Sequence, residues 1–156
     1  MKNRILGVDP GLVETGWSIV DIFNRRLEYI ASGVIKTDIN LPIPQRLLSI
    51  HQGITTVIEQ HEPMTAAIEN TYVNSNFASS LKLAHARAAS MLPLAAAGLT
   101  IEEYPAKTVK KCLVGNGKAD KEQMQAMLKL LLGGMVIKNN NEADAVAIAI
   151  CHAYHI

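Results

Sequence analysis

Aromatic residues, cysteines and long apolar runs are all scarce in this sequence of 156 residues. Phenylalanine, tryptophan and tyrosine make up 4% of it, so the apolar fraction of 49% consists mostly of alanine, isoleucine, leucine and valine. Such a composition is typical of mixed α/β domains with closely packed helices. The two cysteines, Cys112 and Cys151, lie far apart in the sequence and form no paired motif, which indicates a reduced chain.

Segments that would carry the chain to or across a membrane are missing from the pattern. Only four apolar residues separate Arg4 from Asp9, too few for a signal peptide, and the longest apolar run, 91–99, is interrupted by Pro93. We therefore expect a cytoplasmic protein in which residues 1–156 form a single domain. The formal net charge of +1 argues against a non-specific nucleic-acid coat protein, although a binder of restricted nucleic-acid sites needs only a local excess of positive charge.

The spacing of apolar and turn-forming residues predicts an α/β fold. Short apolar or alternating segments predict five strands, at 5–8, 16–23, 27–36, 64–68 and 100–104. Helical spacing predicts helices at 42–61, 77–97, 105–113, 120–132 and from 141 to the end, and we expect Pro93 to kink or end the second. A hairpin joins the second and third strands, whereas helices join the later ones, so the sheet should be mixed, with helices on its faces.

Three acidic residues lie where such a fold gathers its chemistry. Asp9 and Glu69 follow the first and fourth predicted strands, and functional sites collect at strand ends where the chain direction switches. If these strands are neighbours, the two carboxylates repel each other unless a cation such as Mg²⁺, which prefers oxygen ligands, lies between them. Asp144 lies in the first turn of an otherwise apolar helix that should pack on the sheet, with Asn141 on the same face and Glu142 directed away.

Each acid alone also has a simpler interpretation. Asp9 precedes a proline and a glycine, as a turn residue does, and Glu69 fits a surface position. Asp144 fits a helix cap or a first-turn acid. Only the combination of the three favours a catalytic or metal-binding site.

Several motifs follow one another along the chain in a fixed order. They occupy residues 5–11 and 15–16, 67–70, 80–83 and 86–87, 109–111, 115–117 with Lys121, and 142–149. Together they resemble the RuvC family of bacterial Holliday-junction resolvases, although the first motif alone is shared with many ribonuclease-H-like proteins. The resemblance implies a ribonuclease-H-like α/β fold with a mixed five-stranded sheet flanked by helices. It also implies a homodimer that makes paired, symmetric, Mg²⁺-dependent nicks in four-way DNA junctions during recombination and repair.

The resemblance assigns roles to the acidic residues and shows one departure from the family. Asp9, Glu69 and Asp144 match catalytic acids that hold two Mg²⁺ ions, for which Mn²⁺ can substitute, with Asp9 as the bridging ligand. The family has Asp, or in some members His, where this chain has Asn141. An amide offers an uncharged carbonyl oxygen, so this site should hold two cations less well. The sequence leaves open whether Asn141 is the natural residue or an introduced substitution.

Residues 104–121 form the most basic segment of the sequence, with five lysines and a single acidic residue, Asp120. Its lysines are Lys107, Lys110, Lys111, Lys118 and Lys121. Lysines suit phosphate contacts, although the same charges also fit a solvated helix surface. The resemblance places Lys110 and Lys121 beside the active site, where one could stabilise charge in the transition state.

Other contacts rest on the resemblance as well. It implies DNA contacts for Lys82 and Arg87 and the stacking of Tyr72 on an unpaired base, although a packed surface tyrosine fits the sequence equally well. The alanine-rich helix that begins near Phe77 would form the dimer contact, or it would pack within its own subunit. The branch-migration proteins RuvA and RuvB are the implied partners.

Two alternative functions remain open from the sequence. One is a related ribonuclease-H-like nuclease that processes RNA, and the other is a junction-binding protein with impaired catalysis, which Asn141 would favour. A sugar-kinase or actin-like phosphotransferase is excluded because such proteins need two large lobes.

Overall fold

A five-stranded sheet forms the centre of the molecule in the computed structural model, which describes residues 1–71 and 75–156. Its strands are β1 (Asn3–Asp9), β2 (Glu14–Phe23), β3 (Arg26–Lys36), β4 (Thr65–Asn70) and β5 (Thr100–Pro105). They lie in the order β3-β2-β1-β4-β5. The first three pair antiparallel, as hairpin connections require, whereas β4 and β5 run parallel to β1. The predicted mixed sheet is therefore confirmed.

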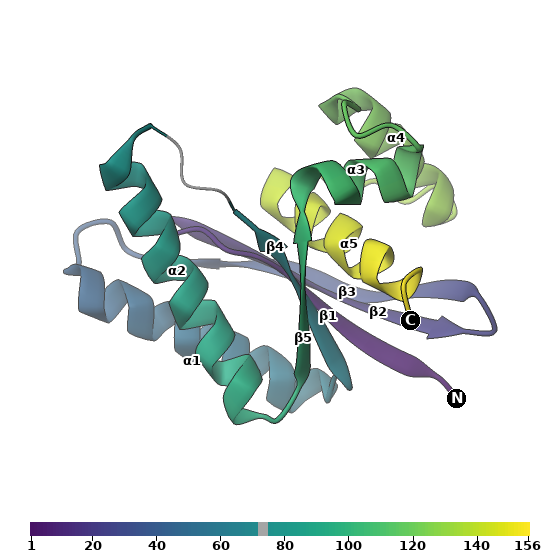
Figure 1. The fold of residues 1–156 in the computed structure, drawn as a ribbon. Helices are drawn as coiled ribbons and strands as arrows, with labels where there is room; N and C mark the ends of the chain where they lie inside the picture. The colour runs from purple at the N-terminus through teal and green to yellow at the C-terminus, as the bar shows by residue number, and fades with distance from the viewer. Residues whose placement is uncertain (72–74) are drawn as a thin grey trace.

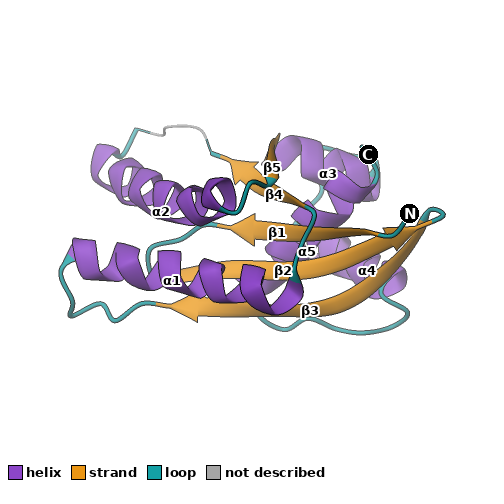
Figure 2. Ribbon diagram, turned by 90° about the horizontal axis from the view of Figure 1, so that it is seen from below, coloured by secondary structure: helices purple, strands orange, loops and turns teal. Residues whose placement is uncertain are grey.

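In the described ranges of the chain, five helices cover the two faces of the sheet (Figures 1 and 2). They are α1 (Ile43–His61), α2 (Phe77–Ala96), α3 (Ala106–Val114), α4 (Lys121–Leu131) and α5 (Asn140–Ala153). Helices α1 and α2 pack on one face, while α5 lies on the other with α3 and α4 around it. Each face has its own apolar core, around Leu6, Ile54 and Leu94 on the first and around Val146 and Ile150 on the second.

The alternation of side chains along β1 and β4 determines which face carries the acids. Leu6 and Val8 point to the core beneath α1 and α2, as do Ala66 and Ile68. Since successive residues of a strand point to opposite faces, Asp9 and Glu69 belong to the face that α5 covers. The parallel register pairs Val8 with Ile68, so the two acids follow directly on paired residues of neighbouring strands.

Helix α5 approaches the sheet unusually closely because small residues lie beneath it. A Cβ atom at Gly7 would lie 2.2 Å from the carbonyl oxygen of Ala145, and one at Gly16 would lie 2.0 Å from that of Asn141. Beside them, the buried Ser18 hydroxyl donates a hydrogen bond of 2.9 Å to the carbonyl of Ala145. These contacts fix the first turns of α5 above the ends of β1 and β2.

The structure and the predicted elements differ mainly in where individual elements begin and end. Of the two effects expected of Pro93, it does not end helix α2, which continues to Ala96 within the predicted range, whereas α5 ends at Ala153 rather than at the end of the chain. Strand β4 begins at Thr65 instead of Met64, whose backbone N–H bonds the carbonyl of Arg4 just before the strand. In the described ranges, none of the helices has the length and apolarity needed to cross a membrane.

We expect Gly16→Ala to weaken both folding and the junction cleavage that the family resemblance implies, because the new methyl group would meet the backbone of α5 and push its acid-bearing end off the sheet. Overpacking of this kind typically costs about 1–3 kcal/mol of unfolding free energy, measurable by urea denaturation. The control is Gly98→Ala, where a Cβ meets nothing within 4 Å but the backbone has a φ of +73°. That substitution should cost about 1–2 kcal/mol and leave cleavage unchanged. Equal loss of cleavage in both variants would contradict the proposed contact.

Candidate active site

Three acidic side chains converge between the sheet and α5. Asp9 ends β1, Glu69 lies near the end of β4, and Asp144 projects from the second turn of α5. Their charges influence one another, since Asp144 acts on both Asp9 and Glu69, and Glu69 acts on Asp9. The structure therefore brings together the three acids that the sequence singled out.

Burial and mutual repulsion make full ionisation of these acids unfavourable. Burial, followed by the charges of Asp144 and Glu69, raises the pKa of Asp9 to about 8. Burial and then Asp144 raise the pKa of Glu69, and burial raises that of Asp144. A group of crowded carboxylates with raised pKa values is a site that an added positive charge would stabilise.

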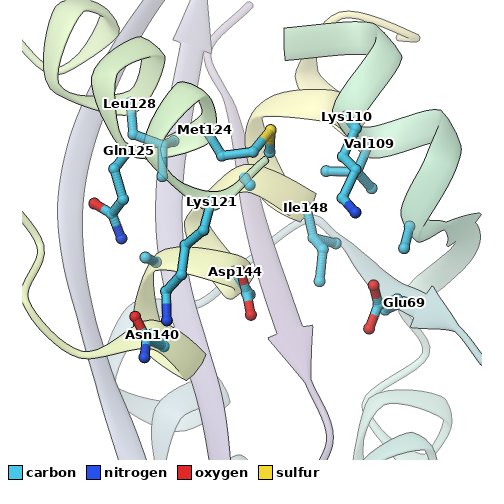
Figure 3. Close-up of a pocket in the computed structure, with 13 residues that line it drawn as sticks. Glu69, Val109, Lys110, Lys121, Met124, Gln125, Leu128, Asn140, Asp144 and Ile148 are labelled. Carbon is cyan, nitrogen blue, oxygen red and sulfur yellow. The ribbon is translucent and has the colours of Figure 1, made fainter. Parts of the chain in front are cut away.

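Two lysines supply part of that positive charge. Lys110 lowers the pKa of both Glu69 and Asp144, and Lys121 lowers that of Asp144, against the larger effect of burial. In Figure 3, Lys110 reaches from α3 toward Glu69, and Lys121 reaches from α4 toward Asn140, with Asp144 on the next turn of α5. The two lysines and these two acids line one pocket of about 320 Å³, whose remaining wall is largely apolar.

Asn141 does not line this pocket but points to the start of β2. Its Nδ2 donates a hydrogen bond of 3.0 Å to Oε2 of Glu14, which also accepts one of 3.3 Å from Nδ2 of Asn139. These two amides, together with Lys36 at 3.4 Å from Oε1, lower the pKa of Glu14.

Glu14, the hydrogen-bond partner of Asn141, was not among the residues that the sequence singled out. Its sequence position could have indicated its place, because β2 runs antiparallel to β1. The start of β2, with Glu14, therefore lies at the same end of the sheet as Asp9. The prediction for Glu142 agrees with the structure, because its carboxylate accepts a hydrogen bond from Ser32 on β3, away from the pocket. The N-cap of α5 is Asn139, whose side chain accepts from the backbone of Glu142.

Arg87 has a structural position in this chain. Its Nη1 donates a bond of 2.6 Å to the backbone carbonyl of Glu69, and its Nη2 forms an ion pair of 2.9 Å with Glu103. Arg87 thereby fixes the end of β4 that carries Glu69, and its contact with DNA stays a prediction.

The other predicted DNA contacts lie on the surface or outside the described residues. The exposed ones are Lys82, Lys107, Lys111 and Lys118. Tyr72 falls outside the ranges that the structure describes. For all of them DNA contact stays a prediction.

Comparison with known proteins identifies the family. The profile of the family described as "Crossover junction endodeoxyribonuclease RuvC" matches residues 5–152. The chain is 46% identical to the RuvC of Gluconacetobacter diazotrophicus over 97% of this chain and 90% of that protein. It is 49% identical to the RuvC of Rhodopseudomonas palustris, over 97% and 87%. This chain belongs to the RuvC family. It is accordingly a crossover junction endodeoxyribonuclease, a nuclease that resolves Holliday junctions.

A solved structure of the family agrees with this fold. The structure of Thermus thermophilus RuvC in complex with a Holliday junction substrate superposes on this chain with a TM-score of 0.92. It is 27% identical and covers 98% of this chain and 94% of its own. The predicted ribonuclease-H-like sheet and the predicted family are thus confirmed.

RuvC-family nucleases are metal-dependent, and the residues of this pocket suit a hard cation. All the acidic donors are carboxylate oxygens, the ligands that divalent ions such as Mg²⁺ prefer. Burial keeps the pKa values of Glu69 and Asp144 raised even though Lys110 lowers both and Lys121 lowers that of Asp144, and neither lysine offsets the raised pKa of Asp9. A divalent cation would supply the charge that is missing.

We expect Asp9→Asn to stabilise the metal-free protein at neutral pH. The pKa of Asp9 is about 8 in the folded chain against an ordinary value of 3.8. Between these values the folded state retains a proton that the unfolded state releases, so the free energy of unfolding falls as pH rises from about 4 to 8. Removing the charge should weaken this pH dependence and add at least about 1 kcal/mol near pH 8.

Thermal denaturation in EDTA and in Mg²⁺ checks this expectation. Mg²⁺ should raise the Tm of the wild-type chain by binding the folded state, and should have far less effect on Asp9→Asn. Glu59→Gln, an exposed charge removal on α1, serves as the control and should behave as wild type. A lower Tm for Asp9→Asn in EDTA would show that the carboxylate stabilises the metal-free fold, contrary to the argument.

Proposed function

We propose that this nuclease cuts two opposed strands of a four-way junction as a homodimer, with Mg²⁺ held by Asp9, Glu69 and Asp144. The observation that carries the proposal is that Glu69 and Asp144 line one pocket with Lys110 and Lys121, while the charges of both acids act on the neighbouring Asp9. Two Mg²⁺ ions, or Mn²⁺ in their place, would activate a water for attack on the phosphodiester and stabilise the leaving 3′ oxygen. The products would carry 5′-phosphate and 3′-hydroxyl ends.

The acids and the lysines would have different roles, the acids in binding the cations and the lysines in binding the phosphate. Asp9 lies between the strands that carry Glu14 and Glu69 and has the most strongly raised pKa, which suits a ligand shared between two cations. Lys110 and Lys121 approach the acids from α3 and α4, where their ammonium groups would hold the scissile phosphate and offset charge that develops on it. The amide of Asn141 contributes at most one neutral oxygen.

Helix α2 supports the homodimer proposal. An apolar stripe at helical spacing is exposed along it, and its members are Phe77, Leu81, Ala84, Ala88 and Leu92. Leu81 and Leu92 are 60% and 61% exposed. Since α1 covers the opposite side of α2, this stripe has no cover within the described part of the chain. A second copy of α2 would bury both stripes in a two-fold contact and present two equivalent sites to a near-symmetric junction.

The proposed substrate and the proposed partner proteins are inferred from different observations. The Thermus thermophilus relative, whose fold this chain shares over nearly its whole length, is bound to a Holliday junction, which supports junction DNA as the ligand here. RuvA and RuvB as partners are inferred from family membership alone, and the same holds for a cytoplasmic location.

We expect a mobile four-way junction, labelled on each strand, to be nicked symmetrically in Mg²⁺ or Mn²⁺, whereas linear duplex stays intact. The variants address position 141. Asn141→Asp adds a negative charge that should lower the Mg²⁺ concentration needed for cleavage, but its new carboxylate faces that of Glu14. Combining it with Glu14→Gln restores a donor opposite the new acid, so the double variant should need less Mg²⁺ than either single variant.

Each outcome of this experiment separates the alternatives. Selective junction binding without cleavage by any variant would favour a binding protein with impaired catalysis. Cleavage of structured RNA in preference to junctions would favour the RNA-processing nuclease. Equal Mg²⁺ requirements in all variants would show that position 141 is not near the cations.

We expect Leu81→Glu to dissociate the dimer, because a charge in the centre of the apolar stripe would be buried against its own copy. Sedimentation velocity gives the oligomeric state, and the junction assay should show single nicks in place of paired ones. The matched control is Leu130→Glu on α4, where the leucine is 73% exposed, and it should remain dimeric. If both variants are dimers that make paired cuts, the stripe on α2 is not the contact.

A further inference from the structure

The structure brings together two cysteines that the sequence shows without a paired motif. Cys112 lies on α3 and Cys151 on α5, whose C-terminal half runs alongside α3 (Figure 1). Both are free thiols, Cys151 fully buried and Cys112 half-buried. His155, one turn beyond Cys151, completes the cluster, and one donor atom from each of the three residues lies within 4.8 Å of the others. None of the three lines the pocket that holds the acids.

The spacing of these donors suits a tetrahedral ion of the zinc class. Zn–S bonds of about 2.3 Å and Zn–N bonds of about 2.0 Å place neighbouring ligand atoms about 3.5–3.8 Å apart. Here Sγ of Cys151 lies 3.9 Å from Nδ1 of His155, and all three donor atoms lie within 4.8 Å of one another, so binding would contract the cluster by up to about 1 Å. A disulfide between the cysteines would need no third donor, whereas a cation makes use of the imidazole as well. Thiolate and imidazole together select soft or borderline metals, not the Mg²⁺ of the acidic pocket.

Neighbouring groups hold the imidazole of His155 in place, and two of their interactions oppose metal binding. The ring of His155 packs on that of Tyr104, with centroids 5.1 Å apart. Its Nδ1 lies 2.7 Å from the carbonyl oxygen of Cys151, so it must turn from that oxygen to bind a metal. Burial raises the pKa of the Cys151 thiol to about 12, so a cation must also displace that proton. His152 cannot join, because its two ring nitrogens already bond Thr65 and Tyr104.

The geometry points to a binding site for one Zn²⁺-class cation, formed by Cys112, Cys151 and His155, with a water as the fourth ligand. Cys112 is two residues beyond Lys110 on α3, and Cys151 is two turns beyond Asp144 on α5. A bound cation would therefore fasten α3 to α5 and fix the lysine side of the catalytic pocket relative to the acid side. Its role is structural, distinct from the cleavage reaction.

Titration of the reduced, full-length protein with Co²⁺ under anaerobic conditions tests this site. Sulfur ligation gives an intense charge-transfer absorption that carboxylates do not, so Co²⁺ in the acidic pocket does not contribute. We expect one such site per chain, displaced by Zn²⁺, with Zn²⁺ also raising the Tm in saturating Mg²⁺. Cys112→Ser should abolish the band, and His155→Ala should weaken Zn²⁺ binding at least about tenfold, as the loss even of outer-shell partners can do.

The matched control is His85→Ala, which removes an exposed imidazole from α2 and should leave the band and the Zn²⁺ affinity unchanged. Absence of the band in the wild-type chain, or its persistence in Cys112→Ser, would overturn the proposal. So would rapid conversion of both thiols to an intramolecular disulfide in air with no metal affinity in the reduced state. Since the readouts are spectroscopic and thermal, failure here leaves the proposed cleavage reaction untouched.

Discussion

The close packing of α5 on the sheet is the constraint on which the active site depends. Gly7, Gly16 and Ser18 leave no side-chain bulk between the helix and strands β1 and β2, so the backbone of α5 rests almost directly on the sheet. The residues of α5 beyond Asp144 are mostly alanine, valine and isoleucine, and they are buried. Because neither surface can shift without a steric clash, Asp144 is held at a fixed place relative to Asp9.

Electrostatic repulsion at the same place is the opposing effect. The packing that fixes α5 also partly buries three carboxylates together, and their raised pKa values measure that cost. Two lysines outside the sheet, Lys110 on α3 and Lys121 on α4, reduce this electrostatic cost by lowering the pKa of Asp144. Helices α3 and α4 are thus needed electrostatically as well as for the core around Val109, Leu113 and Leu128. What repulsion remains is the property that makes the pocket receptive to a divalent cation.

Periodicity and turn residues were sufficient to predict the strands, the helices and the mixed sheet, because each element buries a regular apolar pattern. They could not show that β1 and β4 are neighbours, which follows from the crossover through α1 and brings Asp9 beside Glu69. The sequence left open whether Pro93 kinks or ends α2, and the helix passes through this buried proline and continues to Ala96. Long-range pairs such as Cys112 with Cys151 leave no local pattern at all.

The pair formed by Glu14 and Asn141 explains how an amide fits at position 141 of this chain. A carboxylate at position 141 would face the carboxylate of Glu14 across the distance of 3.0 Å that the amide now spans as a hydrogen bond. With the amide, Glu14 keeps its charge, held by Asn139, Asn141 and Lys36. Position 141 is best understood with Glu14, because the charge of one determines which side chain the other can accommodate.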